Sequence, residues 1–175
     1  QVADVVGQAS RVAVAEWSHW PGGALRWLDV ARPEAPGLLS SSHVEQWQEA
    51  VAREGGHVFL GGYDEVLRVY LVPDDGSAED EVTVAGALNA PLAIQDLATR
   101  GTHVIAALGR GGTGAMWIVD AADPGDLREV ALVYVEGAAY GVAADGDHVF
   151  VAADASGLAI IDVSQPAEAA IVAQV

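Results

Sequence analysis

Short runs of apolar residues, separated by turn-forming residues, make up most of the chain. In the C-terminal part, the turns Asp-Gly-Asp, Asp-Ala-Ser-Gly and Ser-Gln-Pro separate the runs 140–144, 148–153, 158–163 and 169–175. Runs of this length, rich in Val and Ile and bounded by Gly, Pro and Asp, are typical of β-strands joined by hairpins. The 3.6-residue periodicity of an amphipathic helix is absent along the sequence. The pattern therefore predicts an all-β protein.

The runs recur in units of similar length. His57, His103 and His148 each begin the second run of a unit, and Arg11 begins a weaker copy, so the units repeat every 45–46 residues. The residue that ends the third run recurs at comparable intervals: Asp29, Leu71, Asp120 and Asp162. Four strands in each repeated unit of 40–50 residues are the signature of a β-propeller, in which every unit forms one four-stranded antiparallel blade.

The composition of the strands agrees with this architecture. The runs 104–108 and 149–153 are apolar at every position, whereas a sheet with one solvated face would alternate. A propeller blade is buried on both faces because it packs between two neighbours. We therefore predict a single β-propeller domain over residues 1–175, with blades at roughly 1–42, 43–88, 89–136 and 137–175.

The number of blades leaves three arrangements open. Four blades can form a complete ring, since propellers have about 4–8 blades. They can also be half of a ring that another copy completes, or a segment of a larger propeller. An open arc would expose two apolar blade faces, which favours association. The chain begins at Gln1 without a signal-peptide pattern, so we expect it to be a processed chain or an excerpt of a longer one.

The segment Gly157–Pro166 resembles the core of the LVIVD repeat, a bacterial β-propeller repeat. The segments 114–124 and 24–33 are similar, whereas the second unit departs from the pattern at Leu71. The resemblance implies a secreted or surface-attached bacterial protein, from a family in which few members have an assigned activity. An extracytoplasmic location (periplasmic, surface or secreted) is therefore expected.

Charge and composition restrict the partners. The chain carries 25 acidic residues against 8 arginines and no lysine, for a formal charge of -17. Nucleic acids and anionic membranes both require a cationic surface, so neither is an expected partner. No apolar run reaches the roughly 20 residues of a membrane-spanning helix. The absence of cysteine excludes disulfides and thiolate metal sites.

Propeller topology predicts an aromatic surface. The connections between the second and third strands of each blade, and those between blades, lie on one side of the ring, which we call the top face. The opposite side carries mainly carboxylates. Aromatic residues and Arg dominate binding hot spots, so we predict a protein-binding or scaffold module. Alternatively, the tryptophans fold back over the first blade. The predicted partner-binding residues of the top face are Trp17, His19, Trp20, His43, Trp47, Tyr63, Arg110 and Tyr140.

Candidate metal ligands are few, and we expect no cofactor other than calcium. Asp4 and Asp96 occupy matching positions in the strand that lines the central channel. They are a speculative site for a hard cation such as calcium, or they bond to the neighbouring blade's backbone or to channel water. The stretch 74–81 is acidic and is interpreted as a solvated loop, with weak calcium binding as the alternative.

Other recurring residues are interpreted as structural. The three histidines open strands of different blades, so the ring should hold them apart and away from a common metal. Asp29, Asp120 and Asp162 are predicted to cap the turns that follow them. The Gly-rich stretch 109–114 is predicted to be a flexible connection.

No nucleophile motif such as Gly-x-Ser-x-Gly occurs, so an enzyme is not expected. The alternative is a metal (calcium)-dependent enzyme, which would combine the acids at the channel mouth with His19 or His43, or a ligand-binding propeller that uses the same acids.

Overall fold

In the computed structural model, the described residues are 2–8, 10–17, 23–44, 48–72 and 83–175, and they form four four-stranded antiparallel sheets. The first sheet contains β1 (Val2–Gln8), β2 (Arg11–Trp17), β3 (Gly23–Asp29) and β4 (Gly37–Val44). The second contains β5 (Gln48–Glu54), β6 (His57–Gly62), β7 (Val66–Leu71) and β8 (Thr83–Asn89). The third contains β9 (Ile94–Arg100), β10 (His103–Arg110), β11 (Thr113–Asp120) and β12 (Arg128–Glu136). The fourth contains β13 (Gly141–Asp145), β14 (His148–Ala152), β15 (Leu158–Asp162) and β16 (Ala170–Gln174).

The helical content of the described residues consists of two short 3₁₀ turns, Asp154–Ser156 and Pro166–Glu168. In every sheet the strands are hydrogen-bonded in the order in which they occur along the chain. The prediction of an all-β protein built from four-stranded antiparallel units is therefore confirmed.

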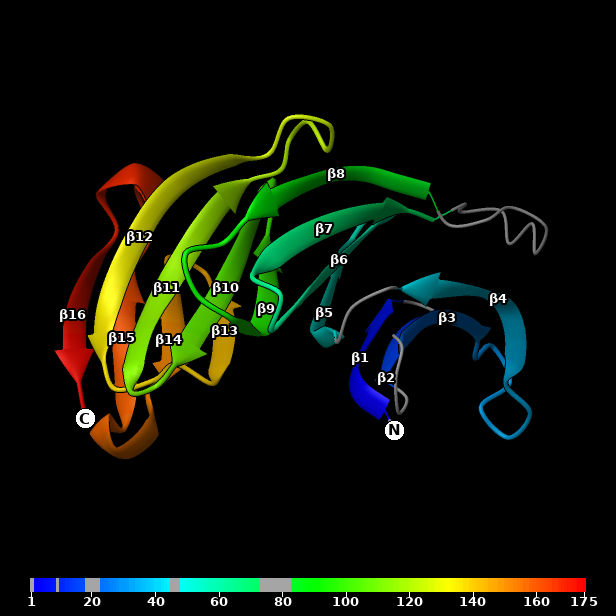
Figure 1. The fold of residues 1–175 in the computed structure, drawn as a ribbon, viewed down its shortest axis with the longest axis horizontal. Coiled ribbons are helices and arrows are strands. Elements are labelled where there is room, and N and C mark those ends of the chain that lie inside the picture. Colours follow the sequence, from blue (N-terminus) through cyan, green and yellow to red (C-terminus); the bar gives the residue numbers. More distant parts are fainter. Residues whose placement is uncertain (1, 9, 18–22, 45–47, 73–82) are drawn as a thin grey trace.

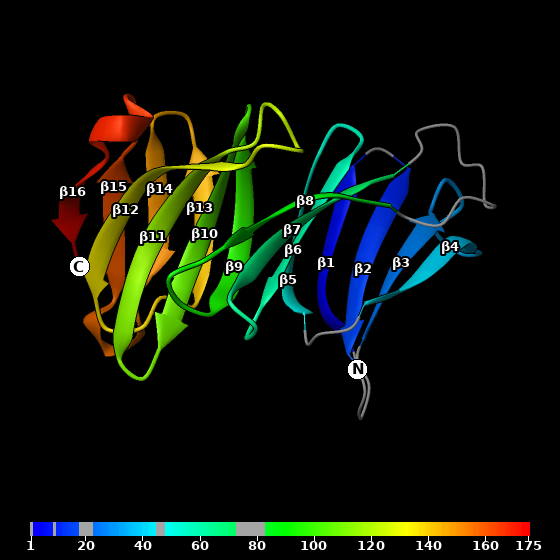
Figure 2. The ribbon, with the colours of Figure 1, turned by 45° about the horizontal axis from the view of Figure 1, so that its top comes forward.

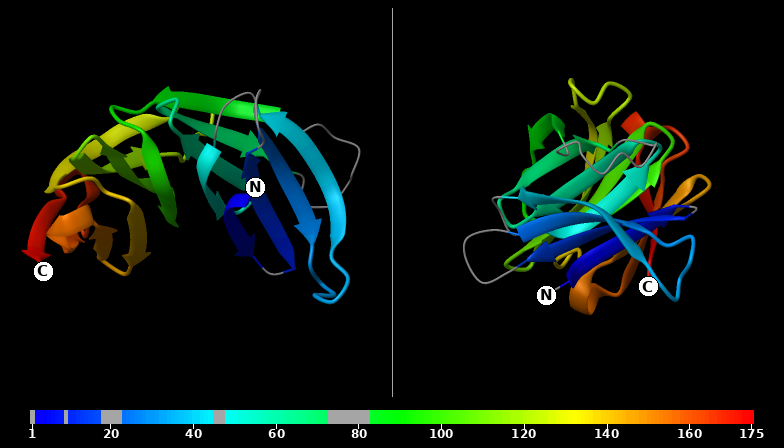
Figure 3. Two further views of the ribbon diagram at one scale, coloured as in Figure 1. Left: turned by 60° about the horizontal axis from the view of Figure 1, so that its bottom comes forward. Right: turned by 90° about the vertical axis from the view of Figure 1, so that its right-hand side faces the viewer.

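The sheets follow one another along an open arc (Figures 1 and 2). Strands β1, β5, β9 and β13 contact one another in that order and form the inner side of the arc. The first and fourth sheets lie at opposite ends of it (Figure 1). Figure 3 shows the arc from a third side and from its first-sheet end, where successive sheets cross at an angle. In the described part of the chain, no strand of the fourth sheet pairs with a strand of the first.

Three apolar layers hold the sheets together, one at each joint. Between the first and second sheets, Leu25 and Trp27 pack against Leu60 and Tyr70. The layer between the second and third sheets includes Phe59, Leu67, Ile94 and Trp117, and the layer between the third and fourth includes Ile105, Met116, Val149 and Ile161. Blades with two buried faces explain why the runs of the third sheet lack apolar–polar alternation.

The recurring aspartates cap turns, as predicted. The backbone N–H of Ala31 donates to Asp29 Oδ1 at 2.8 Å, and those of Ala122 and Ser164 donate in the same way to Asp120 and Asp162. Each bond spans two residues and closes the loop after the third strand of its blade.

The Gly-rich stretch is a tight turn rather than a flexible connection. Strand β10 continues to Arg110 and β11 begins at Thr113, with which Arg110 pairs. Only Gly111 and Gly112 connect them, with φ of 59° and 84°. Two consecutive positive φ angles are what a two-residue hairpin of right-handed twist requires, and glycine adopts them without strain.

Candidate functional site

The top face is formed by the turns β6–β7 and β10–β11 and by the segment that leads into β13. Tyr63 lies in the first of these turns and is 49% exposed, and Tyr140 lies just before β13 and is 56% exposed. Arg110 ends β10 beside the second turn, and its side chain is 65% exposed. Two tyrosines and an arginine therefore remain accessible on one side of the arc.

Ion pairs fix the turn that carries Tyr63. Arg110 Nη1 lies 2.6 Å from Glu65 Oε1, so the third sheet is linked to the β6–β7 turn of the second sheet. On the other side of the turn, Arg68 Nη1 lies 2.5 Å from Asp64 Oδ2. Glu65 has a φ of 61°, a conformation that is uncommon for a non-glycine residue. The turn is thus held at both of its charged residues, and Tyr63 precedes them.

The other predicted top-face residues are placed differently or are not described. His43 lies within β4, opposite Ala24, and is exposed, so it belongs to a strand rather than to the predicted loop. Trp17 is likewise the last residue of β2. Three of the predicted residues lie outside the described part of the chain: His19, Trp20 and Trp47.

The two channel carboxylates join neighbouring sheets. Asp96 Oδ1 accepts the N–H of Leu97 at 2.9 Å, and its Oδ2 accepts the N–H of Val142, in β13 of the next sheet, at 2.8 Å. Asp4 does the same with Val5 at 2.7 Å and with Val51, in β5 of the second sheet, at 2.8 Å. An inner strand has a neighbour on one side only, so half of its N–H groups need another acceptor. The aspartates supply it.

Burial also affects the titration of two carboxylates on the inner strands, Asp96 and Glu49. Desolvation raises the pKa of Asp96 above its ordinary value of 3.8, although the bonds from Val142 and Leu97 oppose the shift and the charge of Asp4 adds to it. Glu49 in β5 also has a raised pKa because it is partly buried. Among the described residues, no group of three or more His, Asp or Glu side chains has the arrangement of a metal site. Cation binding at Asp4 and Asp96 stays a prediction, and the predicted calcium loop 74–81 lies outside the described residues.

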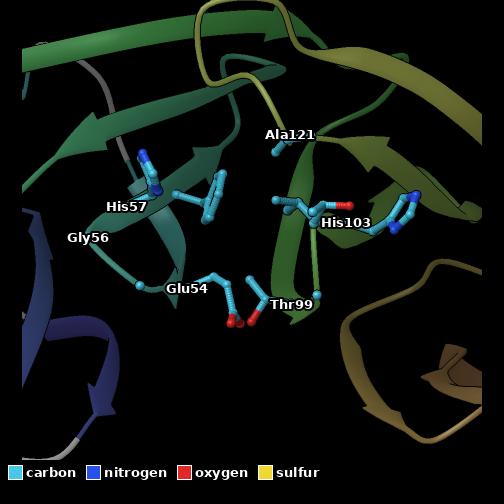
Figure 4. A pocket seen from close by; sticks show the side chains of 12 residues that line it. Glu54, Gly56, His57, Thr99, His103 and Ala121 are labelled. Atoms are coloured by element: carbon cyan, nitrogen blue, oxygen red, sulfur yellow. The ribbon is translucent and has the colours of Figure 1, made fainter.

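A pocket of about 300 Å³ lies between the second and third sheets, at the turns β5–β6 and β9–β10 (Figure 4). His57 of the second sheet and His103 of the third sheet both line it. Figure 4 shows their rings on opposite sides of the pocket, with Glu54 and Thr99 between the two sheets. The pocket is thus lined by one carboxylate, two threonine hydroxyls and two imidazoles, and sequence reasoning missed it because the residues come from two repeats.

No helix in the described residues has the length and apolar character needed to cross a membrane.

Comparison with known proteins identifies the repeat. Residues 136–175 match the family model described as "LVIVD repeat". This match confirms the resemblance that the sequence showed in its last unit. No curated protein matches the chain at the significance required.

Solved structures show the fold. The WD40 domain of coronin from Toxoplasma gondii superposes with a TM-score of 0.77 at 15% identity, over 99% of this chain and 45% of that one. The computationally designed Ika8 protein gives 0.68 at 14% identity, over 94% and 46%. The designed Ika4 protein gives 0.66 at 14% identity, over 91% and 89%. The chain therefore spans about half the length of the first two structures.

Proposed function

We propose, from the premise that this chain is a propeller arc whose last unit is an LVIVD repeat, that it is a non-catalytic protein-binding or scaffold module. The observation that carries the proposal is the top face, where Tyr63 and Tyr140 expose about half of their surface and Arg110 is ordered by Glu65. Tyrosine and arginine contribute most to binding when a partner buries them, because each combines a large contact area with a polar group.

Several features support a protein as the partner. A formal charge of -17 disfavours nucleic acids and anionic membranes, so the partner should present a neutral or basic surface. The ion pairs at Asp64 and Glu65 hold the β6–β7 turn, so binding would require little further ordering of it. An extracytoplasmic location remains part of the proposal, on the strength of the repeat alone.

The test compares captured proteins. The tagged 175-residue chain is incubated with extract of its source organism, and the bound proteins are quantified by mass spectrometry. For one or more specific partners, the double variant Tyr63→Ala/Tyr140→Ala should capture at least about tenfold less protein than the wild type does. The matched control Val84→Ala/Ile171→Ala removes two exposed apolar side chains near the starts of β8 and β16, and this variant should still capture those partners. Equal capture by both double variants would contradict the proposal.

A further inference from the structure

One apolar sheet face at the end of the arc is left without a neighbour. It consists of Ala143, Phe150, Ala152, Leu158 and Ile160, which we call the C-terminal face. Phe150 pairs with Ala143 on one side and with Ile160 on the other, and Ala152 pairs with Leu158. Phe150, Leu158 and Ile160 are half-buried, and Ala143 and Ala152 are exposed. The fourth sheet is the last of the described sheets at this end of the arc (Figure 1).

The repeat shows what such a face normally does. At the same register positions, the third sheet has Ile105, Ala107, Met116 and Ile118. All four are at most 1% exposed, because the fourth sheet packs on them. The C-terminal face thus has the composition of a blade-to-blade interface without a blade on it.

The first sheet has the complementary face at the other end of the arc. The residues of the fourth sheet that pack on the third include Val149, Val151 and Ile161. Their counterparts in the first sheet are Val12, Val14 and Leu28. Val5 and Leu38 lie beside them and are 56% and 57% exposed. We call these five residues the N-terminal face.

A polar pair on the N-terminal face is compatible with packing. Arg26 Nε lies 2.8 Å from Glu16 Oε2 on this face. In the second sheet, Arg68 takes the position of Arg26, and its ion pair with Asp64 is largely buried at the joint with the first sheet. A sheet with an Arg–carboxylate pair at this position therefore already packs on its predecessor within this molecule.

The inner strands also specify which sheet can follow the fourth. The aspartates that accept the two bonds between sheets lie in the first and the third sheets, and the second and fourth have Ala50 and Gly141 at the same position. The third sheet follows one without an aspartate, and the N–H of its Leu97 is bonded by its own Asp96. The first sheet has the same arrangement, since the N–H of Val5 donates to Asp4 of the same strand. It therefore fits behind the fourth sheet as the third fits behind the second.

We infer that the C-terminal face binds the N-terminal face of a second copy of this chain, and that two copies close head to tail into one ring. A second copy supplies a matching first sheet without any further component. One copy spans 45% and 46% of the lengths of the coronin WD40 domain and of Ika8, so two copies correspond to one such molecule. Head-to-tail contacts form a closed ring when the rotation per subunit is half a turn.

The first test is the mass of the 175-residue protein in solution, measured by light scattering after size-exclusion chromatography across a concentration series. The inference predicts twice the 18.0 kDa of one chain. Ile160→Lys and Leu28→Glu should each weaken the dimer at least about a hundredfold, because each buries an unpaired charge in both interfaces. The matched control Val84→Glu adds a charge at an exposed position of β8, outside both faces, and should leave the dimer intact.

Mixing the two variants tests the head-to-tail geometry. In a mixed dimer, one interface combines both substitutions and the other is wild type on both sides. Equimolar Ile160→Lys and Leu28→Glu should therefore form a heterodimer, although each alone is a monomer. This rescue also shows that both variants are folded.

Three results of the mass measurement would overturn the inference. They are a wild-type chain that stays a monomer at the highest concentration, oligomers that grow beyond two copies, and a dimer that survives both substitutions. Absence of rescue on mixing two folded variants would equally contradict it.

Discussion

The joint between the third and fourth sheets and the joint between the second and third are built from equivalent positions with different residues. In the former, Asp96 bonds the N–H of Val142, and Arg100 donates to Gly146 O at 2.6 Å and to Asp147 Oδ1 at 2.7 Å. In the latter, Ala50 stands at the position of Asp96 and Glu54 at that of Arg100.

The difference has a visible consequence in the fold. Where Arg100 reaches across the joint of the third and fourth sheets, its guanidinium links them. At the joint of the second and third sheets, Glu54 does not do so, and the pocket lies there (Figure 4). This joint is linked instead by Thr99 Oγ1, which donates to Arg53 O at 3.2 Å, and by the Arg110–Glu65 pair.

The comparison teaches that the apolar layers and the polar links have separate roles. All three joints have a buried apolar layer, which is the largest stabilising contribution and requires only the repeat. The polar links vary from joint to joint. The aspartate bonds between sheets occur at alternate joints. Each aspartate also accepts the N–H of the next residue in its own strand, and this is the N–H that an aspartate of the preceding sheet would otherwise accept.

The largest effect is expected from removing an aspartate link. Asp96→Ala leaves two N–H groups of half-buried strands without an acceptor and should lower the free energy of unfolding by about 1–3 kcal/mol. Asp4→Ala should act similarly at the joint of the first and second sheets. Chemical denaturation measures both. The control Asp162→Ala removes an aspartate that bonds only its own exposed turn and should cost less. Equal losses for Asp96→Ala and Asp162→Ala would show that the link between sheets has no special weight.

Asp96 and Asp162 should contribute to stability with opposite pH dependence. Desolvation raises the pKa of Asp96, so the folded protein binds its proton more tightly than the unfolded chain does. The stability that the wild type has over Asp96→Ala should therefore be largest below the ordinary pKa of 3.8 and decrease as pH rises through the raised value. Hydrogen bonds from Ser164 lower the pKa of Asp162, so its contribution is present above 3.8 and is lost as pH falls. Carboxyl titrations by NMR that show both shifts in one direction would refute this contrast.

The smallest effect is expected from introducing the ion pair of the third–fourth joint at the joint between the second and third sheets. Glu54→Arg with Thr102→Asp places an Arg–Asp pair where Arg100 and Asp147 stand in the next joint. An exposed pair of this kind should raise the free energy of unfolding by only about 0.5 kcal/mol. Glu54→Gln is the control for removal of the carboxylate alone. If the double variant is less stable than this control, the two joints differ in more than these residues.

Local features of this fold were predictable from the sequence. The repeat of His57, His103 and His148 marks the second strand of three sheets, and the aspartates that end the third strands cap their turns as predicted. Both depend on residues close together in the chain. The length of the turn at Gly111 and Gly112 was misjudged because strand pairing continues to Arg110, and composition alone does not show where pairing stops.

Contacts between repeats were harder to predict. The partner of Asp96 lies 46 residues away, and the sequence left a cation, water and the neighbouring backbone as alternatives. His57 and His103 line one pocket because neighbouring sheets converge there, which spacing along the chain does not show. The sequence also left a closed ring and an open arc as alternatives, since a sheet face that packs on a neighbouring blade and one that has no neighbour show the same apolar pattern.

The central claim is that Asp4 and Asp96, on the inner strands of the first and third sheets, each link their sheet to the next one. Amide hydrogen exchange tests it most directly. NMR should show that the N–H of Val142 is protected in the wild type and loses its protection in Asp96→Ala, while that of Val51 remains protected. In Asp4→Ala the N–H of Val51 should lose its protection, while that of Val142 remains protected. An amide of Val142 that exchanges freely in the wild type, or one that stays protected in Asp96→Ala, would contradict the claim.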